Sequence, residues 1–253
     1  MPRPPPRRGP VKNVDETSWK QAGRLCWLWT AVTRRVAYFT IQARRGLDGL
    51  TAHLGAKISG IVGSDRWGAY NRVPLYRRQL CWAHLQRDFQ ALVDRGGPAK
   101  DVGNELLGMT QDVFHWWYRV RDGTLRRATL RTYIEELRPW LRELLERGRV
   151  CGCAKTAAVC KNLLTLEPAL WAFVRIQGVE PTNNAAERAL RPAVLWRKRS
   201  FGCHSEPGCR FVERMLTVVQ TLRLRQREVI DYLYDTIQSH RLGLPNPKLL
   251  PMG

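Results

Sequence analysis

The sequence predicts an α/β protein with a mixed sheet flanked by helices, and three observations support this prediction. Three β-like runs rich in Val, Ile, Thr and aromatic residues open the chain, at 11–20, 24–33 and 36–42. Short strand patterns then alternate with helical patterns up to about residue 99. Between 100 and 175 helical spacing dominates and no strand pattern occurs, so we expect an α-helical insertion there.

Polar turns between the first three runs favour two successive antiparallel hairpins. Two further strands are expected, at 59–64 and 76–81. Helical spacing of apolar residues predicts the remaining elements, which are helices at 47–54, 84–93, 102–120, 125–147, 157–164, 183–190 and from about 209, with a break near 225–227. Pro139 should break or restart the helix that contains it, because proline removes a hydrogen-bond donor.

These elements suggest a core that is interrupted once. The first part of the core covers 11–99, the helical insertion covers 100–175, and the end of the core with its C-terminal helices covers 176–242. Residues 1–10 are rich in Pro and Arg and are expected to be disordered. Residues 243–253 form a tail.

Basic residues greatly outnumber acidic ones. The chain has 42 Lys and Arg against 22 Asp and Glu, a formal net charge of +20 at pH 7. This balance is hard to explain for an enzyme of small metabolites and indicates a polyanionic partner, either nucleic acid or an anionic membrane surface. A GC-rich genome would also favour Arg codons, but it does not explain why acids are so few.

The chain also gives indications about its compartment. It has no apolar stretch of about 18 residues, so no membrane span is expected. Its basic first residues are not followed by the apolar segment of a secretory signal. Seven cysteines, an odd number, favour reduced thiols over a disulfide framework. The sequence therefore predicts a cytoplasmic protein.

Three acidic residues are distinguished by their surroundings. Asp15 lies in the first expected strand, Asp65 directly follows a short strand, and Glu187 lies on a short helix. Neighbouring strands of a mixed sheet can bring two carboxylates to one edge, and a helix packed on that sheet can add a third. Glu16 is a second carboxylate beside Asp15, but in a strand its side chain should point to the opposite face.

Three converging carboxylates would suit Mg²⁺ or Mn²⁺, since hard cations prefer oxygen ligands. Two such ions about 3.5–4 Å apart can activate a water or a 3′ hydroxyl for in-line phosphoryl displacement. Acids alone are weak evidence, because the chain has 22 of them.

Four segments carry a resemblance to a known family. They are Val-Asp-Glu-Thr-Ser-Trp from residue 14, Ser-Asp-Arg-Trp-Gly-Ala-Tyr from 64, Cys-Trp-Ala-His from 81 and Asn-Asn-Ala-Ala-Glu-Arg-Ala-Leu-Arg-Pro from 183. In this order they resemble the motifs of the transposases of insertion sequence 66, over about residues 11–240. The last motif is the most specific.

The resemblance implies a bacterial DDE transposase with a ribonuclease-H-like core. Asp15, Asp65 and Glu187 would be its catalytic, metal-binding triad, and two Mg²⁺ or Mn²⁺ ions its cofactors. It also implies a helical insertion between the second Asp and the Glu, which agrees with the helical pattern over 100–175. The expected reaction is metal-dependent DNA strand cleavage followed by strand transfer in transposition.

Residues around Glu187 are candidates for DNA binding. Asn183 and Asn184 are good helix-start residues, or their amides lie near the metal site or DNA backbone. Arg191, four residues after Glu187, can pair with it or contact phosphate. The stretch from 188 to 227 has ten basic and two acidic residues, which would give DNA phosphates a salt-sensitive track. The candidates in and before it are Asn183, Asn184, Arg188, Arg191, Arg197, Lys198 and Arg199.

Cys81, His84 and Trp67 are candidates for supporting the active site. The Cys-x-x-His pair follows the second Asp and could orient the active-site wall, or His84 could contact the scissile phosphate. Trp67 could stack on DNA bases or pack beneath the site. Zinc binding by this pair or by the cysteines near 151–160 and 203–209 is a weaker alternative, since no second pair has clear ligand spacing.

Only 14 residues precede Asp15, whereas full-length transposases of the family carry DNA-binding elements upstream. We therefore expect a chain truncated at its N-terminus. The expected partners are DNA, as transposon ends and target, further copies of the chain on DNA, and companion proteins of the element, with no membrane. An alternative is a non-catalytic DNA-binding remnant or partner of a full-length transposase, and a nuclease of the same fold is a weaker third.

Overall fold

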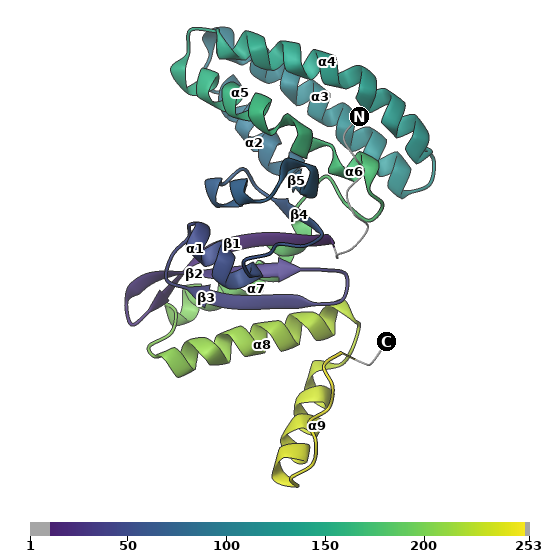
Figure 1. Cartoon of the computed structure of the whole chain (residues 1–253). Helices are drawn as coiled ribbons and strands as arrows, with labels where there is room; N and C mark the ends of the chain where they lie inside the picture. Colours follow the sequence, from purple (N-terminus) through teal and green to yellow (C-terminus); the bar gives the residue numbers. More distant parts are fainter. Residues whose placement is uncertain (1–10, 251–253) are drawn as a thin grey trace. The chain divides into compact units, whose positions relative to one another are not determined.

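The computed structural model describes residues 11–250, which form two compact units (Figure 1). The sheet unit contains 11–60, 68–72 and 184–250, and the helical unit contains 61–67 and 73–183. Strands pair both antiparallel and parallel and are accompanied by many helices, so the mixed α/β class is confirmed. Residues 61–67, 73–99 and 176–183, which the sequence assigns to the core, group with the helices in this division. The expected disorder of 1–10 lies outside the described residues.

Three antiparallel strands form the sheet of the sheet unit, as the sequence predicts. They are β1 (Val11–Gln21), β2 (Arg24–Val32) and β3 (Ala37–Gln42), with β2 between the other two. Ala22 and Gly23 join β1 to β2 with positive φ angles of 49° and 77°. Two residues with positive φ form the tight turn whose twist matches that of a hairpin.

Both faces of this sheet are covered. Leu28 of β2 lies in an apolar cluster with α7 (Asn184–Ser200) and α8 (Glu206–Leu224). Trp29, next in sequence, points to the other face, where its ring contacts His53 of α1 (Leu47–Leu54). Figure 1 shows α1 and α8 on opposite sides of the strands. The alternation of the strands thus sets which residues can meet α7.

Helix α8 also covers the outer strand β3. Three of its side chains, spaced four residues apart, accept hydrogen bonds from alternate backbone N–H groups of β3: Thr221 from Ala37 and Thr217 from Phe39, both at 3.1 Å, and Glu213 from Ile41 at 2.5 Å. An outer strand otherwise leaves such groups available for pairing with another chain. After α8 the chain breaks at 225–228, as expected, before α9 (Val229–Arg241).

The helical unit begins with a short parallel pair. Strand β4 (Ile61–Ser64) pairs with β5 (Arg78–Leu80), which follows two short 3₁₀ helices. The helices that follow are α2 (Trp82–Val93), α3 (Gly97–Arg121), α4 (Arg127–Arg149), α5 (Ala154–Leu166) and α6 (Ala172–Arg175). Among the first four of them each helix packs against the next, and the short last helix, α6, packs against α4.

The expected break at Pro139 is wrong, because α4 runs through this residue without interruption. Pro139 and Glu135, whose carbonyl loses its helical donor, are both on the exposed side of α4. Water can therefore satisfy that carbonyl, while the buried leucines on the other side hold the helix in place.

One helical stretch, Ala154–Arg175, is long and apolar enough by composition to cross a membrane. It consists of α5, a 3₁₀ turn and α6, and its side chains Leu163, Leu166 and Leu170 are buried inside the helical unit. It also contains Glu167, which is buried and ion-paired with Arg138 at 2.8 Å. This is the pattern of a core helix.

Candidate active site

Helix α7 carries the last of the four sequence motifs, and its small residues pack closely against the sheet. Ala186, Ala189, Leu190 and Ala193 recur at helical spacing and are buried in the cluster beneath the sheet. Glu187 then lies on the neighbouring flank, in the first turn of the helix. A carboxylate there is favoured by the partial positive charge of the helix N-terminus.

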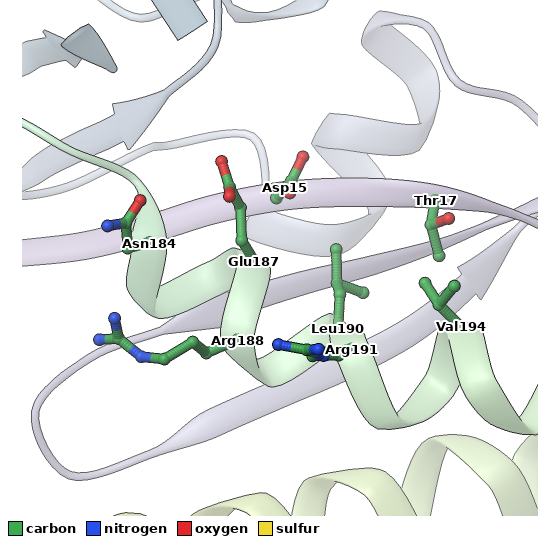
Figure 2. Close-up of a pocket in the computed structure, with 8 residues that line it drawn as sticks. All are labelled: Asp15, Thr17, Asn184, Glu187, Arg188, Leu190, Arg191 and Val194. Carbon is green, nitrogen blue, oxygen red and sulfur yellow. The ribbon is translucent and has the colours of Figure 1, made fainter. Parts of the chain in front are cut away.

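Asp15 and Glu187 line the same open pocket of the sheet unit, which has a volume of about 500 Å³. The remaining lining residues are Thr17 from β1 and Asn184, Arg188, Leu190, Arg191 and Val194 from α7. Figure 2 shows the Asp15 and Glu187 carboxylates pointing in the same direction. The structure therefore brings together two of the three predicted acids and three of the predicted DNA-binding residues.

Glu16 points to the opposite face of β1, as strand alternation predicts. Its side chain is buried and accepts hydrogen bonds from Arg45 at 2.8 Å and from the Tyr70 hydroxyl at 2.6 Å. Neighbouring carboxylates on one strand thus have different surroundings. Asp15 lines the open pocket, whereas Glu16 is held in the interior of the sheet unit.

Asp65 lies in the helical unit, directly after β4. Its carboxylate accepts a hydrogen bond from the Trp67 backbone N–H at 2.9 Å. Beneath it, the fully buried Arg78 donates to the Asp65 carbonyl at 2.8 Å and to the Ser64 hydroxyl at 3.2 Å. Arg66 fixes the other side of this turn through Asp88, also at 2.8 Å.

Cys81 and His84 lie at the same end of the parallel pair as Asp65. Ser64 is in register with Leu80, and the Cys81 backbone N–H donates to the Ser64 carbonyl at 2.9 Å. Helix α2 begins at the next residue, which places His84 in its first turn. The Cys81 sulfur also accepts a hydrogen bond from the backbone N–H of the buried Asn183 at 3.2 Å. Cys81 thus connects two of the sequence motifs within the helical unit.

The predicted DNA-binding residues differ in their surroundings. Arg188, Arg191, Lys198 and Arg199 are exposed on α7. Arg197 is partly buried, and its guanidinium donates to the hydroxyls of Thr17 and Ser18 at 3.1 and 2.6 Å and to the Ser18 carbonyl. Arg197 therefore fastens α7 to β1 below the pocket. Trp67 is exposed, whereas Trp82 is buried and donates to the Leu170 carbonyl.

Some residues of this region are not evident from the sequence. Arg78 is one of many arginines and occurs within a strand pattern, so nothing marks it as the buried group beneath Asp65. Thr17 and Val194 line the pocket only because β1 and α7 pack together. The strand period does indicate that Thr17 shares a face with Asp15.

Fold and pocket together define a class, a mixed α/β protein with acidic and basic side chains of separate motifs gathered at one open pocket. Residues 7–210 match the model of the family described as "Transposase IS66 family". The chain therefore belongs to the IS66 transposase family.

Two curated relatives come from Sinorhizobium fredii and are named uncharacterized proteins y4qI and y4hP. The first is 28% identical over 245 residues, covering 87% of this chain and 44% of the relative. The second is 24% identical over 223 residues, covering 79% and 40%. The chain thus spans less than half the length of these relatives. No solved structure matches it significantly.

Proposed function

We propose that the chain carries the catalytic region of a DDE transposase, with a ribonuclease-H-like core that cleaves and transfers DNA strands with the help of metal ions. One observation carries this proposal. Asp15 and Glu187 come from motifs far apart in sequence, yet they line one pocket together with Arg188 and Arg191. In a chain of a transposase family, acids beside phosphate-binding cations suit phosphodiester chemistry.

Asp15, Asp65 and Glu187 would hold Mg²⁺ or Mn²⁺, two ions in all. The donor set fits, because carboxylate oxygens are the ligands these cations prefer and the open pocket leaves room for their waters. When bound, the ions would stabilise charge on the phosphate and lower the pKa of the attacking water. Arg78 would position Asp65 by holding its backbone.

The proposed reaction has two displacements at phosphorus. In the first, a water oxygen bonds to the phosphorus at an element end and the bond to the 3′ oxygen breaks, leaving a 3′ hydroxyl and a 5′ phosphate. In the second, that 3′ hydroxyl attacks a phosphorus of the target strand, which releases a target 3′ hydroxyl. Asn184, Arg188 and Arg191 would orient the phosphate, since a positioned guanidinium binds phosphate oxygens in pairs.

The partners follow from this reaction. Transposon ends and target DNA would be the substrates, and further copies of the chain would assemble on the DNA, with companion proteins of the element. Lys198 and Arg199 would add phosphate contacts beyond the pocket. The site of action would be the cytoplasm, where the bacterial chromosome lies, and the proposal includes no membrane.

The test is plasmid nicking and strand transfer by the full chain in Mg²⁺ or Mn²⁺. We expect nicking by the wild type and by Glu180→Gln, a control at an exposed glutamate, and none by Glu187→Gln. Equal activity of wild type and Glu187→Gln would contradict the assignment of the triad. Salt-sensitive DNA binding without any metal-dependent cleavage by the wild type would instead favour a non-catalytic DNA-binding remnant or partner.

A further inference from the structure

A second pocket lies between α7 and the C-terminal end of α8, inside the sheet unit. Its volume is about 190 Å³, and it is lined by Ala185, Arg188 and Ala189 of α7 and by Gln220, Arg223 and Leu224 of α8. Arg188 lines this pocket and also the candidate active site. The two pockets therefore share a cation.

The lining is suited to an anion with several oxygen atoms. Arg188 and Arg223 supply two guanidinium groups, and none of the six lining residues is acidic. Gln220 is only 9% exposed, and its side-chain nitrogen is buried without a hydrogen-bond partner among residues 11–250. A buried amide donor without an acceptor is costly, so an oxygen ligand entering this pocket would remove that cost.

The backbone around the pocket also favours an anion. Ala185 belongs to the first turn of α7, where the helix presents partial positive charge, and Arg188 directly follows that turn. The opposing end of α8 would present partial negative charge, but its last carbonyls accept hydrogen bonds from the backbone N–H groups of 225–227. These hydrogen bonds reduce the partial negative charge that the end of α8 presents to the pocket.

The size of the pocket indicates which part of a ligand it accepts. Its volume lies below the roughly 300–1,000 Å³ typical of pockets for whole small molecules. The small side chains of Ala185 and Ala189 leave the space open, while Leu224 is partly exposed at the rim. A single phosphate group, flanked by solvent, fits these dimensions better than a base or nucleoside.

We propose that this pocket binds a backbone phosphate of the DNA strand whose neighbouring phosphate lies at the candidate active site. The inference rests on the proposed function, because it takes DNA as the substrate. Arg188 would bridge the two phosphates, and Arg223 and Gln220 would hold the second one. The pocket would fix the position of the strand along α7, without any contact to a base edge.

The test measures DNA affinity in EDTA, where no metal-dependent cleavage takes place. Fluorescence anisotropy of a labelled single-stranded 30-mer is followed at several salt concentrations for wild type, Arg223→Gln and Gln220→Glu. The matched control is Arg214→Gln, an exposed arginine nine residues earlier on α8 and hence on its opposite side. Circular dichroism melting checks that each variant is folded.

We expect Arg223→Gln to bind about 5- to 10-fold more weakly, with a slope of log affinity against log salt reduced by about 0.7. Gln220→Glu places a carboxylate in the pocket and should weaken binding further, by more than about 10-fold. Arg214→Gln should retain the wild-type slope. Equal losses for Arg223→Gln and Arg214→Gln would overturn the proposal, because they would indicate a diffuse surface charge.

Inorganic phosphate distinguishes the source of the ligand. If the wild type binds phosphate in a ³¹P NMR titration while Arg223→Gln leaves DNA affinity unchanged, the pocket takes a free phosphate and the proposal is wrong. Failure of the proposed function has a different signature. In that case wild type and Glu187→Gln both lack nicking activity, while the specific loss of DNA binding in Arg223→Gln persists.

Discussion

Two groups of carboxylates and arginines, one in each unit, have opposite surroundings. In the helical unit, Glu167 is 2% exposed and receives hydrogen bonds from Arg138, Arg142 and Trp171 at 2.8, 3.0 and 2.6 Å. Burial raises the pKa of Glu167, but these hydrogen bonds together outweigh it, so the pKa lies below its usual value of 4.5. In the sheet unit, Asp15 and Glu187 line an open pocket beside arginines.

The difference shows how to separate structural from functional acids. A carboxylate that is enclosed by arginine side chains of the same unit stabilises the fold, and its oxygen atoms are already occupied by hydrogen bonds. Two carboxylates that line a solvent-accessible pocket can instead be approached by a cation from solution, which favours their charged forms. We therefore expect a substitution of Glu167 to change mainly stability, and a substitution of Asp15 or Glu187 to change mainly activity.

The largest expected effect is on activity, from Asp15→Asn in the sheet unit. Losing about 3–4 kcal/mol of charge stabilisation in the transition state slows plasmid nicking about 10²- to 10³-fold. The melting temperature should change little, because the Asn side chain keeps an oxygen that can accept the hydrogen bond from the Glu16 backbone N–H. Asp48→Asn, at an exposed ion pair with Arg44, is the control and should leave both quantities unchanged. A wild-type rate for Asp15→Asn would refute its functional role.

The next effect is on stability, from Glu167→Gln in the helical unit. Removing the charge leaves Arg138 without its buried partner, and we expect a loss of about 2–3 kcal/mol in the free energy of unfolding at pH 7, measured in urea. Glu105→Gln, in an exposed pair with Arg147, should cost less than about 1 kcal/mol. Comparable losses for the two variants would contradict the structural role of Glu167.

This stability difference should depend on pH. Because the folded-state pKa of Glu167 is lowered, its stabilising contribution is complete above the usual value of 4.5. The contribution is lost as the pH falls through the lowered pKa. The difference in free energy of unfolding between wild type and Glu167→Gln should therefore become smaller as the pH falls. A difference that becomes larger would show that the pKa of Glu167 is not lowered in the folded state.

A smaller effect separates neighbouring cations on α7. Arg197→Gln removes the hydrogen bonds to Thr17 and Ser18, and we expect a loss of about 1–2 kcal/mol in the free energy of unfolding. Lys198→Gln, at an exposed position, should leave stability unchanged and weaken DNA binding. If Arg197→Gln affects DNA binding alone, Arg197 contacts phosphate and does not fasten α7.

The smallest effect concerns the hydrogen bonds by which helix α8 covers the outer strand β3. Thr217→Val removes the acceptor of the Phe39 N–H while keeping the side-chain shape, and about 1 kcal/mol should be lost. Hydrogen exchange should accelerate at the Phe39 amide. Thr132→Val, at an exposed position on α4, serves as the control. Unchanged exchange at Phe39 would show that α8 does not protect this edge.

Much of the fold follows from local sequence patterns. The β-branched and aromatic runs predict β1, β2 and β3, and apolar spacing predicts most of the helices to within a few residues. The helix predicted at 183–190 is too short, because α7 continues through Pro192 to Ser200. The helix break predicted at Pro139 does not occur. The free-energy cost of a proline in a helix depends on whether the carbonyl that loses its hydrogen-bond donor faces water, and local sequence does not show this. The position of residues 73–99 with the helical unit is likewise decided by packing between distant segments.

The candidate site shows the same limit. The motifs locate Asp15 and Glu187, and strand alternation separates Asp15 from Glu16. Arg78 and Gln220 carry no local signal, because their importance comes from burial next to segments far away in the sequence. The sequence motifs thus indicate the two acids that line the candidate pocket, but they do not indicate Arg78 or Gln220.

The proposal that Asp15, Asp65 and Glu187 together bind the metal ions is tested most directly by Mn²⁺ binding. Calorimetric titration of the full chain should show saturable Mn²⁺ binding that weakens at least about 10-fold in Asp15→Asn, Asp65→Asn and Glu187→Gln alike. The control Asp48→Asn should bind as the wild type does. Wild-type Mn²⁺ affinity in Asp65→Asn would contradict the account, because the acid of the helical unit would then have no part in the site.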